Sequence, residues 1–132
     1  MTFQGKVLVA DDEAHIRKYT TLLRRSLGVT TIIEATNGRE AVELYQAENP
    51  DLVLLDVNMP ILDGVGALKQ IHALDPDAVV VMLTSLATRQ IIDETAQHGA
   101  TFYLRKDTPR DDVLAQLKRI MAEAFEDDNA PT

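Results

Sequence analysis

The chain has 132 residues, of which 45% are hydrophobic and 26% are charged, and its formal net charge at pH 7 is -8. This length suits a single globular domain with a core of its own, and the composition argues against a globally disordered chain. The excess of acidic residues disfavours binding to phosphate backbones, so we expect no direct contact with nucleic acid, and it favours cationic partners or metal ions.

Three broad classes of protein are disfavoured by what the sequence lacks. It contains no cysteine, so a disulfide framework and a thiolate metal site are excluded. No apolar run approaches the eighteen or so residues of a membrane span. The first residues do not have the basic and apolar pattern of a secretion signal. We therefore expect a cytoplasmic protein without membrane contact.

The first half of the chain alternates strand-like runs with helical periodicity. Residues 6–10 form a continuous apolar run that ends in acids, and residues 14–28 repeat apolar side chains at helical spacing up to a glycine. Residues 29–35 are rich in β-branched side chains and predict a strand nearer the sheet edge. Residues 37–49 begin with a capping pattern and end before a proline, which predicts a helix. Residues 52–56 then form a short apolar run typical of a strand buried on both faces.

The second half repeats the same alternation. A helix is predicted over residues 64–75, opened by an Asp-Gly pair and closed by an Asp-Pro pair. Residues 78–83 are the most apolar strand pattern of the chain. A less apolar helix follows up to His98, and residues 101–105 predict a short strand. The chain thus contains five repeats of strand followed by helix.

The last helix has a recognisable start. Thr108 is predicted as its hydroxyl cap, Pro109 as its first helical residue, and Asp111 as an acid in its first turn. We expect one domain over residues 1–126 and a short acidic C-terminal tail, residues 127–132, that is disordered.

Alternating strands and helices predict an α/β fold, because right-handed crossovers between parallel strands place helices on both faces of the sheet. The strongest apolar runs should be central and the weaker runs should be edges. This arrangement matches a doubly wound, five-stranded parallel sheet of order 2-1-3-4-5 with five helices, the flavodoxin-like order.

Polar side chains follow four of the predicted strands at their carboxyl ends, the edge of an open α/β sheet where ligands bind. They are Asp11, Asp12, Asp56, Thr84 and Lys106. Each alone is more often a solvated or locally bonded residue. Their joint occurrence at one predicted edge indicates a site.

Converging carboxylates repel one another, and a hard divalent cation stabilises such a cluster. Mg²⁺ prefers oxygen ligands and keeps several waters, so one or two carboxylates and a carbonyl oxygen suffice. Without cysteine or a pair of histidines at ligand spacing, zinc is disfavoured. With a metal ion, an ammonium group and a hydroxyl beside it, Asp56 is equipped to attack a phosphoryl group and form an acyl phosphate.

The ordered set of these residues resembles the receiver domain of two-component response regulators, over essentially the whole chain. The acidic pair lies after the first strand and the acceptor aspartate after the third. The matching residues are Asp11, Asp12, Asp56, Pro60, Gly64, Thr84, Tyr103 and Lys106.

The resemblance implies a role for each matching polar residue. Asp56 would be the phosphoacceptor, and Mg²⁺ would be bound directly by Asp12, Asp56 and the Asn58 backbone carbonyl, with Asp11 acting through water. Thr84 and Lys106 would contact the phosphoryl group. Tyr103 would change rotamer as Thr84 is drawn towards the phosphate.

The sequence departs from the family pattern after Lys106. Family members usually have a proline here, joined by a cis peptide bond, whereas this chain has Asp107 and reaches proline only at Pro109. A cis bond before a residue other than proline costs about 3 kcal/mol, so we expect a trans bond and an altered loop.

Two positions where family members vary are Asn58 and Leu86. By resemblance they tune the access of water to the acyl phosphate, and an apolar Leu86 would shield it. The three histidines, His15, His72 and His98, are interpreted as surface or packing residues.

The resemblance also implies partners. The phosphodonor would be a histidine kinase or a histidine phosphotransfer protein, and the chain would catalyse only its own phosphorylation and dephosphorylation. As a stand-alone regulator, it would bind its downstream target through the last two helices and the last strand, with Leu114 and Phe125 as candidate contacts. We expect a monomer or a phosphorylation-dependent dimer.

Two alternative functions remain open from the sequence. The first is a phosphohydrolase of the haloacid dehalogenase type, although those enzymes have a second acid two residues after the nucleophile, where this chain has Asn58, and they carry a cap domain. The second is a binding module that has the receiver fold but signals without phosphate.

Overall fold

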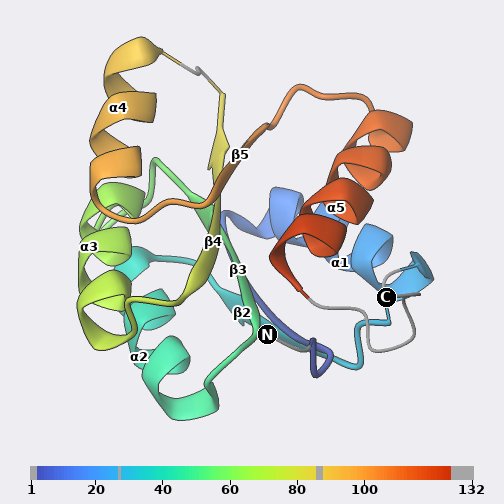
Figure 1. Cartoon of the computed structure of the whole chain (residues 1–132), viewed down its shortest axis with the longest axis horizontal. Coiled ribbons are helices and arrows are strands. Elements are labelled where there is room, and N and C mark those ends of the chain that lie inside the picture. The colour runs from blue at the N-terminus through green and yellow to red at the C-terminus, as the bar shows by residue number, and fades with distance from the viewer. Residues whose placement is uncertain (1–2, 27, 86–87, 126–132) are drawn as a thin grey trace.

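The computed structural model describes residues 3–26, 28–85 and 88–125, which form a five-stranded parallel sheet covered by helices (Figure 1). The strands are β1 (Lys6–Ala10), β2 (Thr31–Ala35), β3 (Leu52–Asp56), β4 (Val79–Thr84) and β5 (Phe102–Arg105). The helices are α1 (Glu13–Ser26), α2 (Gly38–Glu48), α3 (Gly64–Leu74), α4 (Arg89–Gln97) and α5 (Arg110–Ala124). The sheet order is β2-β1-β3-β4-β5, so the predicted flavodoxin-like fold is confirmed.

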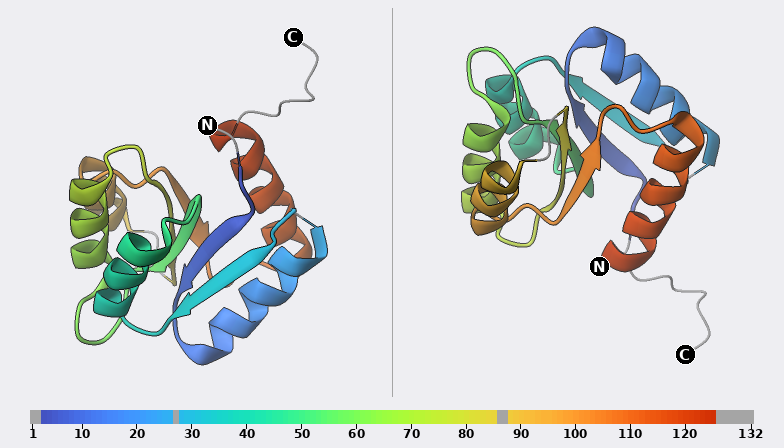
Figure 2. Two further views of the ribbon diagram at one scale, coloured as in Figure 1. Left: turned by 90° about the horizontal axis from the view of Figure 1, so that it is seen from below. Right: turned by 90° about the horizontal axis from the view of Figure 1, so that it is seen from above.

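Helices cover both faces of the sheet, with α1 and α5 on one face and α2, α3 and α4 on the other (Figures 1 and 2). The two faces arise because side chains of a strand alternate between them. Val7 and Val9 of β1 pack in the core with Tyr19 of α1. Leu8, between them, packs in the second core with Leu68 of α3.

The central strands are the most buried, as their apolar sequences predict. Every residue of β3 and β4 is buried, because each of these strands has neighbours on both sides and helices on both faces. The edge strands β2 and β5 contain exposed or half-buried residues. The prediction of which runs are central and which are edges is therefore confirmed.

The start of α2 agrees with the prediction from the sequence, whereas the start of α5 differs from it. Asn37 caps α2 as predicted, with its side chain accepting a hydrogen bond from the Glu40 backbone N–H at 2.8 Å. The prediction for α5 is wrong by one residue, because Pro109 is the N-cap, and within the described residues no side chain makes a capping hydrogen bond there. Thr108 instead lies in a turn, with its N–H donating to the Arg105 carbonyl at 3.2 Å, and a residue before proline is disfavoured in the helical region.

The predicted target contact at Phe125 is also wrong. Phe125 is 7% exposed, and its ring packs against Phe3 with 5.2 Å between centroids. Leu114 is half-buried and stays a candidate. The predictions for Leu86 and for the tail, residues 127–132, lie outside the described residues.

Two further expectations concern the backbone and the membrane. No cis peptide bond occurs in the described part of the chain, so the predicted trans bond between Lys106 and Asp107 is confirmed. Among residues 3–26, 28–85 and 88–125, no helix combines the length and apolar character that crossing a membrane requires.

Candidate functional site

Backbone hydrogen bonds continue past the strand ends and bring the predicted site residues to one edge of the sheet. The Asp11 N–H donates to the Ala35 carbonyl at 3.0 Å, and the Lys106 N–H donates to the Thr84 carbonyl at 2.9 Å. The pairing of Ala10 with Leu55 in the parallel register places the next residues, Asp11 and Asp56, side by side. The convergence predicted from the strand ends is therefore a consequence of the register.

The Lys106 ammonium lies between two buried carboxylates. Its Nζ is 2.8 Å from Asp11 Oδ1 and 3.0 Å from Asp56 Oδ2. Asp11 is fully buried, Asp56 is 4% exposed, and the Lys106 side chain is 9% exposed. The other oxygen of Asp56, Oδ1, accepts a hydrogen bond from the Asn58 backbone N–H at 3.1 Å. Asp107, which stands where the family usually has proline, does not prevent Lys106 from reaching the site.

Burial and charge shift the ionisation of this group. Burial raises the pKa of Asp11 to about 6, and the negative charge of Asp56 adds to the rise, whereas the hydrogen bond from Lys106 opposes it. For Lys106, burial alone would lower the pKa, but the hydrogen bonds to Asp11 and Asp56 outweigh burial and raise it. Two carboxylates facing one ammonium leave a net negative charge when all three are ionised, which favours a further cation.

Asp12 lies at the exposed rim of this pocket, with 62% of its side chain accessible. Its Oδ1 accepts a hydrogen bond from the His15 backbone N–H at 3.1 Å, at the start of α1, and its Oδ2 lies 3.0 Å from His15 Nδ1. These bonds lower the pKa of Asp12. We refer to Asp11, Asp12, Asp56 and Lys106 together as the acidic pocket.

His15 is a neighbour of the acidic pocket that the sequence analysis interpreted as a surface or packing residue. Its Nδ1 is also 3.7 Å from Asp11 Oδ1, and one ligand atom from each of Asp11, Asp12 and His15 lies within 4.8 Å of the others. The signal in the sequence was its position three residues after Asp12, on the first turn of the predicted helix, where side chains three apart are neighbours.

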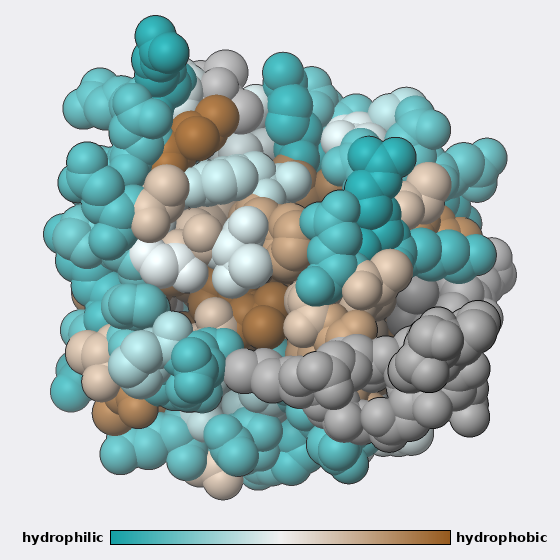
Figure 3. Space-filling model, in the orientation of Figure 1, coloured by the Kyte–Doolittle hydropathy of each residue, from teal (hydrophilic) through white to brown (hydrophobic). Residues whose placement is uncertain are grey.

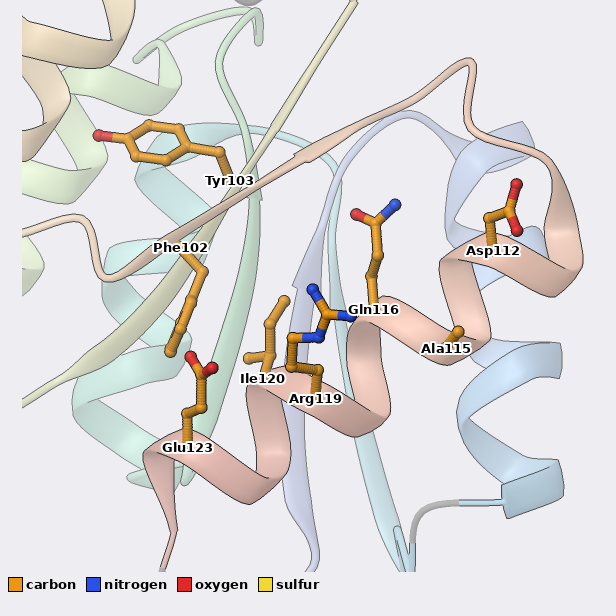
Figure 4. A pocket seen from close by; sticks show the side chains of 8 residues that line it. All are labelled: Phe102, Tyr103, Asp112, Ala115, Gln116, Arg119, Ile120 and Glu123. Carbon is orange, nitrogen blue, oxygen red and sulfur yellow. The ribbon is translucent and has the colours of Figure 1, made fainter.

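Thr84 lies at the site edge of the sheet, whereas Tyr103 lies within β5 and contacts α4. Thr84 ends β4 and is 2% exposed. The Tyr103 hydroxyl donates to the Ile92 carbonyl at 2.8 Å and is 2.8 Å from Thr95 Oγ1, both in α4. Its ring points away from α5 and towards α4 (Figure 4). The predicted switch residue is therefore attached to α4 in this conformation.

Gly64 is required by the close packing of α3 against the end of β3. Its N–H donates to the Val57 carbonyl at 2.8 Å, and a Cβ built on Gly64 would overlap the Asp56 backbone carbonyl. Asp63 caps α3 by accepting a hydrogen bond from the Gly66 N–H at 2.8 Å. The start of α3 thus supports the backbone of Asp56 directly.

Comparison with known proteins agrees with this geometry. The family described as "Response regulator receiver domain" matches residues 7–118. The chain belongs to this family. It is 32% identical over 116 residues to the chemotaxis protein CheY of Bacillus subtilis, covering 88% of this chain and 97% of CheY. It is also 37% identical over 113 residues to the transcriptional regulatory protein PdtaR of Mycobacterium tuberculosis, covering 86% of this chain and 55% of PdtaR.

Among solved structures, a CheX-CheY-BeF3-Mg+2 complex from Borrelia burgdorferi contains a chain with a TM-score of 0.83 and 30% identity, covering 94% of this chain and 92% of that one. The function of this receiver domain is phosphorelay signal transduction, with a phosphoryl group accepted on an aspartate. Receiver domains are signalling proteins and not classical enzymes, so the matches give no support to the phosphohydrolase alternative.

Lys18 is a residue of the receiver domain that the sequence analysis did not single out. Its Nζ donates to the backbone carbonyls of Lys106, at 3.2 Å, and Thr108, at 3.5 Å. It therefore holds the loop after β5, which carries Lys106, against α1. No sequence signal could have shown this, because the bonded residues are 88 and 90 positions apart.

Proposed function

We propose that Asp56 is the phosphoacceptor of this receiver domain. The observation that carries the proposal is the 3.0 Å ion pair between Asp56 Oδ2 and Lys106 Nζ at the ligand-binding edge of the sheet. A carboxylate beside a fixed cation can approach an anionic phosphoryl group, because the ammonium offsets the repulsion between them. Lys106 is suited to this role because its pKa is raised, so it stays protonated.

The donor set of the acidic pocket fits Mg²⁺. It offers carboxylate oxygens, and Asp11 Oδ2 is buried without a hydrogen-bond partner among the described residues, which leaves a buried oxygen available to a cation or its water. We propose that Asp12, Asp56 and the Asn58 backbone carbonyl bind the ion directly and that Asp11 acts through water. When bound, Mg²⁺ supplies charge neutralisation for the phosphoryl oxygens.

The transfer step follows from these positions. A carboxylate oxygen of Asp56 attacks phosphorus of a phosphohistidine, the P–N bond breaks, and the electron pair of that bond returns to the donor imidazole. Lys106 and the Thr84 hydroxyl contact the phosphoryl oxygens of the resulting acyl phosphate. The same pocket then admits the water that hydrolyses it, so the chain catalyses its own phosphorylation and dephosphorylation only.

The switch is proposed to run through Tyr103. Movement of Thr84 towards the phosphoryl group changes the space beside Tyr103, whose hydroxyl is bonded to Ile92 and Thr95 of α4. A change of the Tyr103 rotamer would break these bonds and alter the packing of α4 against β5. Phosphorylation would thus shift the populations of two conformations that a partner distinguishes.

The proposed target surface is the face formed by α4, β5 and α5. Apolar side chains lie between the polar outer surfaces of these helices (Figure 3). A groove of about 460 Å³ there is lined by Phe102 and Tyr103 of β5 and, on α5, by residues that include Gln116, Arg119 and Ile120 (Figure 4). The solved relative was found with CheX, which supports a protein partner for this domain.

The proposed phosphodonor is a histidine kinase or a histidine phosphotransfer protein. We place the exchange in the cytoplasm, where the ATP that charges such a kinase is available. The receiver would act as a monomer or as a phosphorylation-dependent dimer.

The assignment of Asp56 is tested by phosphate incorporation from acetyl phosphate in the presence of Mg²⁺. We expect Asp56→Asn to abolish acid-labile incorporation, because the amide is a poor nucleophile. Asp107→Asn is the matched control, since Asp107 is an exposed acid paired with Arg105 next to the site, and it should retain incorporation. Incorporation by Asp56→Asn would refute the assignment. No incorporation by the unmodified chain would favour a receiver-like module that signals without phosphate.

A further inference from the structure

His15 presents a ring nitrogen to the acidic pocket. Its side chain is 37% exposed, and Nδ1 lies 3.0 Å from Asp12 Oδ2 and 3.7 Å from Asp11 Oδ1. The backbone fixes this arrangement, because the His15 N–H donates to the same carboxylate at Asp12 Oδ1. The imidazole is therefore held at the rim of the pocket by the first turn of α1.

The spacing between His15 Nδ1 and Asp12 Oδ2 suits two neighbouring ligands of one metal ion. With metal–ligand distances of about 2.1 Å, two neighbouring donors of an octahedron lie about 3.0 Å apart and two opposite donors about 4.2 Å apart. The distance of 3.0 Å from Nδ1 to Asp12 Oδ2 equals the first value. The distance of 3.7 Å to Asp11 Oδ1 matches neither value, and this oxygen already accepts hydrogen bonds from the Asp12 N–H and from Lys106, so Asp11 reaches the ion through water. An ion bound here would replace the proton that joins Nδ1 to Asp12 Oδ2.

A second observation points to a ligand in the same pocket. Asp11 is fully buried, and its Oδ2 has no hydrogen-bond partner within the described part of the chain. Lys106 compensates Oδ1 of Asp11 and Oδ2 of Asp56, so this buried oxygen is left for another cation or its water. The His15 edge of the pocket, unlike the Lys106 side, is open to solvent.

The nitrogen donor changes which ions the pocket prefers. Mg²⁺ favours oxygen ligands, whereas imidazole is a good ligand for Ni²⁺, Co²⁺ and Zn²⁺, whose affinities for mixed nitrogen and oxygen sites exceed that of Mn²⁺. We propose that His15 is a transition-metal ligand of the acidic pocket, so that this receiver domain binds such ions through His15 Nδ1 and Asp12, with Asp11 acting through water. This inference rests on the metal site of the proposed function and adds a residue that determines its specificity.

The test compares Ni²⁺ with Mg²⁺ by calorimetric titration of the full chain, at a pH well above the ordinary pKa of imidazole. His15→Ala removes the ring, and His15→Gln keeps a polar group able to bond Asp12. Both should lower Ni²⁺ affinity by about tenfold or more, while Mg²⁺ affinity changes by less than about threefold. His98→Ala is the control, because His98 follows α4 at the opposite edge of the sheet, and it should change neither affinity.

Three other outcomes would overturn the inference. They also distinguish a failure of the His15 assignment from a failure of the proposed magnesium site. If both His15 variants bind Mg²⁺ and the ratio of Ni²⁺ to Mg²⁺ affinity is unchanged, His15 is not a metal ligand. The proposed magnesium site is not affected by that result. An equal loss of Ni²⁺ affinity in His98→Ala would show adventitious binding to surface histidines. Failure of the unmodified chain to bind either ion would overturn the inference together with the magnesium site. Thermal unfolding without metal checks that each variant folds.

Discussion

The raised pKa of Asp11 makes a prediction about stability in the metal-free protein. The pKa of this carboxyl is about 6 in the folded chain against an ordinary value of 3.8, so the folded state binds a proton more tightly than the unfolded state. Ionisation of Asp11 therefore costs folding free energy. As pH falls through about 6 towards 4, the cost is relieved, and stability contributed by this group increases.

The magnitude follows from the size of the shift. A difference of about two pKa units corresponds to roughly 3 kcal/mol when Asp11 is ionised in both states. Between about pH 7 and pH 5, only part of this is regained, because the gain continues until pH reaches the ordinary value of 3.8, where the unfolded state also takes up the proton. The expected gain from Asp11 over that range is about 1 kcal/mol.

The assay is urea unfolding at several pH values with a chelator present, compared between the unmodified chain and Asp11→Asn. Every other titratable group is present in both proteins, so the difference between the two slopes reports on Asp11. The unmodified chain should gain about 1 kcal/mol more than the variant on acidification. Saturating Mg²⁺ should reverse the sign, because protons compete with the metal. Equal slopes without metal would refute the reasoning.

Three further substitutions test other parts of the site. Asp12→Ala should weaken Mg²⁺ affinity markedly and cost about 1 kcal/mol of stability through loss of the cap on α1; an unchanged Mg²⁺ titration would remove Asp12 from the metal site. Gly64→Ala should destabilise the fold by about 1–3 kcal/mol, because its methyl group overlaps the Asp56 carbonyl, and chemical denaturation showing wild-type stability would contradict that packing. Tyr19→Phe should be neutral or stabilising by about 1 kcal/mol, since the Tyr19 hydroxyl is buried without a partner in the described residues; clear destabilisation in the same assay would mean that the hydroxyl is bonded.

Much of the fold could be predicted because the apolar runs and turn residues agree with one another. The apolar run before Asp56 is short, continuous and bounded by proline, and it forms a strand that is buried on both faces. The convergence of Asp11, Asp56 and Lys106 followed from parallel topology alone, since residues after the strands of such a sheet share an edge.

The features that were missed depend on contacts that sequence periodicity does not encode. The burial of Phe125 depends on Phe3 at the other end of the chain. The position of His15 depends on a side-chain rotamer in the first turn of α1, where a polar residue is ordinarily solvated. The shifted start of α5 reflects the turn that Thr108 forms with Arg105, which competes with helix capping for the same residue.

The most direct test of the central claim is to locate the phosphoryl group. The chain is treated with acetyl phosphate and Mg²⁺, the acyl phosphate is reduced with borohydride, which converts the modified aspartate to homoserine, and the peptides are sequenced by mass spectrometry. Conversion at Asp56 that disappears when Mg²⁺ is chelated is the predicted result. Conversion at Asp11 or Asp12, or conversion at Asp56 that is equally efficient without a divalent ion, would contradict it.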